Sequence, residues 1–308
     1  MLAKHYKLLL DLAKTSDTAK ALFEKHFPLV PTEPNVHQIY FPTLFLFAYD
    51  GRFTAGSAYA PDNPFAAESF IFASLFTLKL IDAAPRNPDR SGRTDAGVSA
   101  RRNAVRIDLL RQDKGVVKKL NCVLPPYVRI LAAAPVPKPD FSLRFSAKSR
   151  IYVYKLGVEN ENQIQMLHNF CQSFVGTWDF SSLSNEERGR NCIRTILRSQ
   201  CIKRDSQCEF WVCGVGFCRN QVRCMVGALL ECLALKSDVI PLYLNGARAK
   251  QYQMASSYNL CFVECVYMPE ICWKGDFEVS IGGQMWGNVS QEIWAQNTDE
   301  KLEKEDVM

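Results

Sequence analysis

The residues best suited to chemistry lie in the stretch SGRTDAGVSA, residues 91–100. Arg93 and Asp95 stand two residues apart, with Gly92 before them and Gly97 after them. Because glycine lets a ligand approach the main chain closely, such a loop can hold a carboxylate at the floor of a cleft. The permanent charge of Arg93 would favour the ionised form of Asp95. Asp, Thr and Gly also form ordinary turns, and spacing alone does not separate the two interpretations.

The segment GRTDAGV resembles the signature of the TruA family of tRNA pseudouridine synthases, which usually reads GRTDAGVHA. Ser99 stands where the histidine is common. The resemblance implies that Asp95 is the catalytic residue. It also requires that the other parts of the family pattern occur in order along the chain.

A second match covers residues 141–156, FSLRFSAKSRIYVYKL, which resembles the family pattern F-x-x-R-F-S-A-x-x-R-x-Y-x-Y. The alternation predicts a strand in which Tyr152 and Tyr154 face the same side of a sheet. Two core tyrosines would give the same alternation. The resemblance implies that the ring of Tyr152 stacks on the target base, an interaction worth about 1–3 kcal/mol.

Two further matches lie in the second half of the chain. Residues 176–183, GTWDFSSL, resemble GTHDFSSF, with Trp178 in place of histidine. Residues 217–231, FCRNQVRCMVGALLE, resemble F-L-x-x-M-V-R-x-[IM]-V-G-x-L-x-E and have a helical period. The resemblance implies that Arg223 pairs with the catalytic Asp. At Gly227 the missing side chain would let another element come close.

Basic residues gather around the Asp95 loop. Between Arg86 and Arg129 there are eleven basic residues and four acidic ones, whereas the whole chain has a net charge of +5. A basic surface around a single carboxylate suits a ligand with a phosphate backbone. A solvated basic face without a partner is the alternative. We expect RNA contacts from five residues: Arg101, Arg102, Arg144, Lys148 and Arg150.

Composition indicates an ordinary globular chain. Its 308 residues are 47% apolar and 22% charged, and no apolar run approaches the roughly 20 residues that span a bilayer. The twelve cysteines form no C-x-x-C pair, and residues 1–10 lack a signal-peptide pattern. These features predict an intracellular protein with reduced thiols and no metal site. Cytoplasm, nucleus and mitochondrion all remain open, although Asp11 and Asp17 argue against a mitochondrial presequence.

Periodicity and turn residues place the expected elements. A strand is predicted at Thr43–Tyr49, before Asp50-Gly51, and a helix is predicted to begin at Asn63-Pro64. The sequence further predicts a strand over 104–110, a helix and strand over 118–130, and a strand over 151–156. In the second half it predicts a helix over 164–174, a hairpin that turns at 204–206, and a last strand over 260–267.

The resemblance implies an α+β fold. Two α/β halves would each carry an antiparallel sheet with helices on one face, and the sheets would join into one extended sheet with the catalytic cleft between the halves. The predicted divisions are a 1–40 extension, a 41–136 catalytic half, a 137–285 half that completes the cleft, and a 286–308 charged tail. Family members act as homodimers or as monomers, so the oligomeric state stays open.

The implied reaction is isomerisation of a uridine in tRNA, in the anticodon arm or nearby, without a cofactor. It needs a carboxylate that stays ionised, a state that Arg93 and Arg223 would favour. The rival hypothesis is an RNA-binding paralogue without turnover. Ser99, Trp178 and a divergent segment after Gly51 motivate it, whereas the presence of Asp95, Tyr152 and Arg223 favours an active enzyme.

Overall fold

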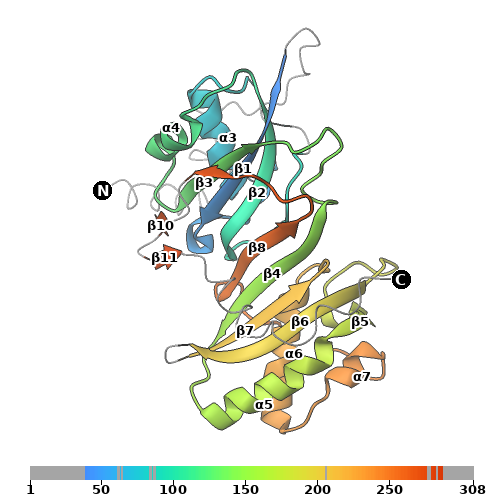
Figure 1. Cartoon of the computed structure of the whole chain (residues 1–308). Helices are drawn as coiled ribbons and strands as arrows, with labels where there is room; N and C mark the ends of the chain where they lie inside the picture. Colours follow the sequence, from blue (N-terminus) through green and yellow to red (C-terminus); the bar gives the residue numbers. More distant parts are fainter. Residues whose placement is uncertain are drawn as a thin grey trace.

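The main element of the protein is a nine-stranded mixed sheet with the order β5-β6-β7-β4-β8-β2-β1-β3-β9 (Figure 1). The computed structural model describes residues 39–286, except for 61, 62, 64, 83, 84, 86, 87, 205, 206, 276–278, 282 and 283. The strands of the sheet are β1 (Phe41–Tyr49), β2 (Ser99–Leu109), β3 (Val128–Pro135), β4 (Ala147–Leu156), β5 (Gly176–Asp179), β6 (Ile193–Arg204), β7 (Gln207–Gly214), β8 (Leu260–Tyr267) and β9 (Lys274–Gly275). A separate pair is formed by β10 (Val279–Ile281) and β11 (Gln284–Trp286).

The helices among the described residues accompany both halves of the sheet. They are α3 (Ala67–Thr77), α4 (Val116–Val123), α5 (Glu161–Cys171), α6 (Gln221–Leu235) and α7 (Ile240–Leu244). Short 3₁₀ turns occur at Gly51–Phe53, Gln172–Phe174 and Ser181–Leu183. Figure 1 shows α3 and α4 beside β1–β3, and α5, α6 and α7 beside β4, β6 and β7.

Two antiparallel sheets meet at one parallel pair. β1 pairs with β2 and β3, while β4 pairs with β7 and β8, all antiparallel. The two groups join where β2 runs parallel to β8, with Ser99 opposite Cys261 and Ala100 opposite Phe262. This arrangement confirms the predicted α+β fold with one extended sheet. The joining pair begins one residue after Val98, so the Asp95 loop lies directly at the junction.

One apolar core underlies all five helices. Ile71 of α3, Leu120 of α4, Leu167 of α5, Val226 of α6 and Ile240 of α7 belong to the same buried cluster. Since that cluster also contains strand residues from both halves, the helices share one face of the sheet, as the family pattern implies. On the opposite face of β1–β3, a second buried cluster is covered in part by residues 136–146.

The predicted elements are present, with shifted ends. The first described helix begins at Ala67 instead of at Asn63, because the Asn63 side chain donates to the Ala55 carbonyl at 2.7 Å within the preceding loop. β2 begins at Ser99, five residues before the predicted strand, because Ala100 pairs with both Tyr49 and Phe262. β8 spans 260–267, as predicted.

One strand crosses the predicted boundary between the two halves. β9 lies within the predicted 137–285 half, yet it pairs with β3 of the other half. The predicted extension is described only at 39–40 and the predicted tail only at 286; the rest of both lies outside the described residues.

Gly227 marks a close approach between α6 and the segment that leads to β8. A Cβ atom at this position would lie 2.3 Å from the Gln253 carbonyl oxygen and 2.6 Å from the Tyr252 ring. The Gln253 carbonyl belongs to the backbone, which cannot move away from an added Cβ as easily as the end of a flexible side chain can. The expected close contact at Gly227 is confirmed. Tyr252 and Gln253, which make this contact, belong to the segment that leads to β8.

We therefore expect Gly227→Ala to destabilise the protein. Alanine gains up to about 1 kcal/mol in helix propensity, but overpacking should lower the free energy of unfolding by roughly 1–3 kcal/mol. Urea titration of both proteins measures the difference. Gly157→Ala is the matched control, because a Cβ there meets nothing within 4 Å. Equal or higher stability of Gly227→Ala would contradict the close packing.

Candidate active site

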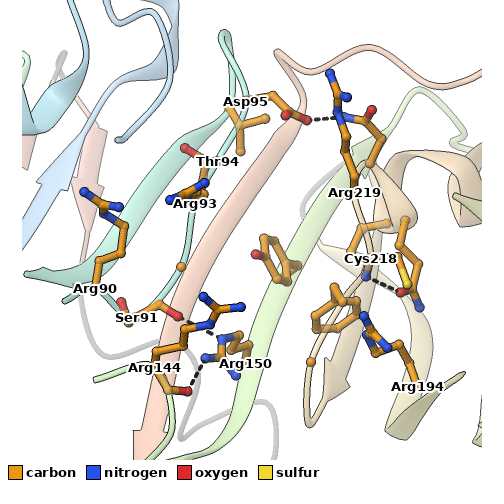
Figure 2. Close-up of a pocket in the computed structure, with 18 of the residues that line it drawn as sticks. Arg90, Ser91, Arg93, Thr94, Asp95, Arg144, Arg150, Arg194, Cys218 and Arg219 are labelled. Carbon is orange, nitrogen blue, oxygen red and sulfur yellow. Dashed lines mark hydrogen bonds between the residues drawn. The ribbon is translucent and has the colours of Figure 1, made fainter. Parts of the chain in front are cut away.

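A cleft of about 1230 Å³ lies between the two halves of the sheet (Figure 2). Residues 88–95 and 141–152 contribute to one side and residues 186–194 and 216–223 to the other. Three of the predicted catalytic residues, Asp95, Tyr152 and Arg223, line this cleft together with Arg93. The structure thus brings together side chains that are up to 130 positions apart in the sequence.

The Asp95 loop is held by hydrogen bonds from the segment around the first strand. The Thr94 amide donates to Ser57 Oγ at 2.9 Å, and the hydroxyls of Thr94 and Tyr49 are 2.6 Å apart. The Gly51 amide donates to Ser99 Oγ at 3.0 Å. Ser99, which replaces the common histidine, and Ser57, in the divergent segment, therefore both support the loop.

Asp95 contacts two residues from the other half of the molecule. Its Oδ2 accepts a hydrogen bond from Asn220 Nδ2 and lies 3.5 Å from Arg223 Nη1. Arg223 is fixed in turn, because its Nε donates to the Ala255 carbonyl at 2.8 Å. The side chain of Asp95 is 42% exposed and faces the cleft, whereas that of Arg223 is only 15% exposed. The predicted pairing of Arg223 with Asp95 is present in the structure.

Arg93 lines the cleft together with Asp95, and its expected influence on Asp95 stays a prediction. It is exposed on the cleft wall, and among the described residues the ion pair of Asp95 is with Arg223. Arg93 also lies close enough to favour the charged form of Glu68, a buried carboxylate that pairs with Arg90 at 2.7 Å. Burial raises the pKa of Glu68, and the adjacent Arg90 opposes that shift.

Asn220 was not singled out from the sequence. It precedes α6 in a left-handed conformation, with φ of 58° and ψ of 11°. Its Oδ1 accepts from Asn185 Nδ2 at 3.1 Å, and Asn185 Oδ1 accepts from Lys250 Nζ at 2.7 Å. This chain of donors directs Asn220 Nδ2 at Asp95. Asparagine tolerates left-handed backbone, so an Asn at the predicted helix start was the available signal.

Tyr152 is clamped between two phenylalanine rings. The Phe217 and Phe262 rings meet it edge-on, with centroids 5.0 Å and 5.1 Å away. Tyr152 is 8% exposed, and its burial raises the pKa of the phenol, which therefore stays neutral. Gly92 faces this group, since a Cβ there would lie 3.9 Å from the Tyr152 hydroxyl. The ring is held rigidly at the cleft wall.

Arg150 binds three backbone carbonyl groups from three segments. Its Nε donates to Ser91 at 2.8 Å, its Nη1 to Val215 at 2.9 Å and its Nη2 to Arg144 at 2.9 Å. Figure 2 shows the bonds to Ser91 and Arg144. Arg150 was expected to contact RNA. The structure directs its guanidinium at carbonyls that belong to both walls of the cleft, so it connects those walls.

The remaining predicted RNA contacts are divided. Arg144 lines the cleft, but Arg101, Arg102 and Lys148 are not among its described lining residues. Arg102 pairs with Glu264 at 3.3 Å, and the Nε and Nη1 atoms of Arg101 are buried.

Arginines from the second half complete the charge of the cleft. Of the described lining residues, nine are arginines and four are acidic. Figure 2 shows Arg194 and Arg219 on the wall opposite Arg90 and Arg93. The predicted basic window ended at residue 129, so it missed Arg190, Arg194 and Arg219. The excess of arginines over acidic residues makes the cleft suited to a polyanion.

Within the described ranges, no three His, Cys, Asp or Glu side chains are grouped so that they could hold a metal ion. None of the described helices is long and apolar enough to cross a membrane.

Comparison with known proteins assigns the family. A family model described as tRNA pseudouridine synthase matches residues 170–268. The tRNA pseudouridine(38/39) synthase of Homo sapiens is 31% identical over 290 residues, which cover 78% of this chain and 59% of that protein. The tRNA pseudouridine synthase A of Methanocorpusculum labreanum is 31% identical over 226 residues, or 72% of this chain and 78% of that protein. The chain belongs to the TruA family of tRNA pseudouridine synthases.

The chain matches 59% of the length of the mammalian relatives, a share that is the same for the tRNA pseudouridine(38/39) synthase of Bos taurus. The family model covers Arg223 on α6 and Asn220 just before it, but not the Asp95 loop. The family model therefore covers the cleft wall formed by residues 186–194 and 216–223, and these relatives match 72% or more of the chain.

We expect Arg150→Lys to destabilise the protein, because one ammonium cannot reach three carbonyls in different segments. Hydrogen bonds to charged groups are worth about 1.5–3 kcal/mol each. Lysine would keep one of them, and two of the bonds are exposed, so the free energy of unfolding should fall by about 1–3 kcal/mol. Urea titration measures it. Arg188→Lys, at an exposed position, should change stability by less than about 0.5 kcal/mol. If the two variants proved equally stable, Arg150 would not connect the walls.

Proposed function

We propose that this protein isomerises a uridine of tRNA to pseudouridine. The observation that carries the proposal is the placement of Asp95, which projects into an arginine-lined cleft while Asn220 and Arg223 hold it from the other half of the molecule. Membership in the TruA family supports this reaction class. A silent paralogue is not favoured by any of these contacts.

The reaction rearranges bonds within one nucleotide. The bond between N1 of the base and C1′ of the sugar breaks, the base turns, and a new bond joins C5 to C1′. The proton lost from C5 balances the one gained at N1, so no external group is consumed. Asp95 acts on the sugar as nucleophile or on the base as proton acceptor, and Arg223 stabilises its negative charge.

The uridine must leave its stack to reach Asp95, which costs a few kcal/mol. Tyr152 offers a rigid, neutral aromatic ring beside the loop on which that base can stack. Arginines on both walls would bind the flanking phosphates and offset the cost. The proposed RNA path therefore follows the cleft, with Arg144, Arg194 and Arg219 as contacts.

The proposed target is a uridine at position 38 or 39 of tRNA. Two mammalian relatives named for those positions match 78% of the chain. An unmodified tRNA with uridine at both positions is the direct substrate test, with carbodiimide mapping of the product. A tRNA that lacks uridine at both positions should not be converted. Conversion at another site would retain the reaction and overturn the target.

We expect Asp95→Asn to lower the conversion of uridine by at least about 100-fold, the low end for the loss of a general base. The amide keeps the shape of the carboxylate, so tRNA binding should stay within several-fold of the unchanged protein. Single-turnover assays and filter binding measure the two quantities. Full activity of the variant would remove Asp95 from the mechanism.

We expect Asn220→Gly to lower turnover while substrate affinity stays constant. Glycine adopts the left-handed backbone of this position without strain, so the change removes the amide that holds Asp95. The loss of a hydrogen bond to a charged group should reduce kcat by about tenfold or more. Asn220→Asp should reduce it further, because a second carboxylate would repel Asp95.

The kinetic comparison separates positioning from folding. The melting temperature of Asn220→Gly should match that of the unchanged protein, and KM should stay nearly constant while kcat falls. If kcat were unchanged, the contact between Asn220 and Asp95 would have no catalytic consequence.

A further inference from the structure

Phe145 is an aromatic residue that lines the cleft but is not buried by it. Its side chain is 82% exposed, whereas Phe141 and Leu143 in the same segment are 2% and 0% exposed. Leaving a phenylalanine in water forgoes the favourable burial that its neighbours gain. Because the exposed ring also lines the cleft, it is available to contact a ligand there.

The backbone beneath the ring is held in one conformation. The carboxylate of Asp89 accepts hydrogen bonds from the Leu143 amide at 2.5 Å, the Arg144 amide at 3.2 Å and the Ser142 hydroxyl at 3.0 Å. The Phe145 amide in turn lies 3.3 Å from Ser142 Oγ and donates to it. Because the turn has these partners, Phe145 is presented to the cleft by a preorganised support.

The same support connects the turn to the rest of the cleft. Arg150 binds the carbonyl of Arg144 and also that of Ser91, at the start of the Asp95 loop. The ring and the loop thus share one bracing residue. Figure 2 shows Arg144 and Arg150 toward one end of the drawn pocket and Asp95 toward the other. A ligand on Phe145 would accordingly lie apart from the group that reacts at Asp95.

The charges around Phe145 select the kind of ligand. The Arg144 guanidinium carbon lies 5.3 Å from the centroid of the Phe145 ring, and the lining of the cleft carries nine arginines against four acidic residues. An apolar peptide or lipid would have to desolvate these cations without a counter-charge. An unpaired nucleotide supplies both a flat base for the ring and a phosphate for the arginines.

We propose that Phe145 is a stacking platform for an unpaired base of the substrate RNA, separate from the uridine that reacts at Asp95. This inference rests on the proposed function, because it takes RNA as the ligand of the cleft. Arg144 binds the phosphate beside the stacked base. The platform holds a second nucleotide of the same strand and so orients the RNA relative to Asp95.

The test compares three substitutions of Phe145 in the full chain. The probes are an RNA stem-loop with the sequence of a tRNA anticodon arm and a fully paired RNA duplex of similar length. Binding is measured by fluorescence anisotropy in proteins that also carry Asp95→Asn, so that turnover does not alter the probe. Phe145→Ala should weaken stem-loop binding by about fivefold or more. Phe145→Leu should stay weak, since leucine is apolar but has no π-face, and Phe145→Trp should bind at least as tightly as phenylalanine.

Duplex binding should change little with any of these substitutions, because paired bases offer no face to the ring. Leu235→Ala, at an exposed apolar residue near the end of α6 and outside the cleft lining, is the matched control and should leave both affinities unchanged. Full stem-loop affinity of Phe145→Leu would overturn stacking, and so would an equal loss for stem-loop and duplex.

The outcome also separates this inference from the proposed function. If the protein with Asp95 intact converts tRNA but Phe145→Ala binds and reacts normally, the platform is wrong and the reaction stands. If the protein converts no tRNA but stem-loop binding depends on Phe145 as described, the reaction is wrong and the platform stands.

Discussion

The site depends on a parallel pairing of two residues in β2 with two residues in β8. Ser99 and Ala100 of β2 pair with Cys261 and Phe262 of β8. This pairing joins the antiparallel strands of the first half to those of the second half. Asp95 stands four residues before this junction, whereas Arg223 lies on α6 and Asn220 just before it, in the other half of the molecule. Asp95, which we propose as the catalytic group, is therefore brought to its partners by the joined sheets. Arg150 reinforces the junction, because its three carbonyl partners belong to both sides.

The segment before β8 adds a second constraint on how Asp95 and Arg223 are placed. It packs against Gly227 through Tyr252 and Gln253, and the Ala255 carbonyl accepts from Arg223. Further along, Ser257 and Tyr258 pack closely against Gly97. A Cβ at Gly97 would lie 2.4 Å from Ser257 Oγ, and the backbone there has a φ of +87°. One short stretch of chain thus contacts α6 and the Asp95 loop at once. Gly227 and Gly97 leave room for this segment, which contacts the elements that carry both Arg223 and Asp95.

Much of the fold could be predicted because the patterns that carry it are local. Alternation placed β8, helical period placed α6, and the motifs identified Asp95, Tyr152 and Arg223 before any coordinates. The misses have tertiary causes. Asn220 depends on a left-handed backbone and on Asn185, which is 35 residues away. For Arg150 the RNA contact stays a prediction, but its bonds to three carbonyls could not be foreseen because only the fold assembles them. Arg190, Arg194 and Arg219 are scattered in sequence, so no window of local charge could reveal them.

The positive charge of the cleft comes entirely from guanidinium groups, since no lysine is among its described lining residues. Arginine stays protonated at every pH a cell reaches, and it is not a substrate for the acetyl-transfer reactions that neutralise lysine. The electrostatic field that the cleft offers a polyanion is therefore constant across compartments of different acidity. It is also insensitive to the metabolic state that sets the level of lysine acetylation. A ligand of this cleft would therefore meet the same set of positive charges at any of these acidities.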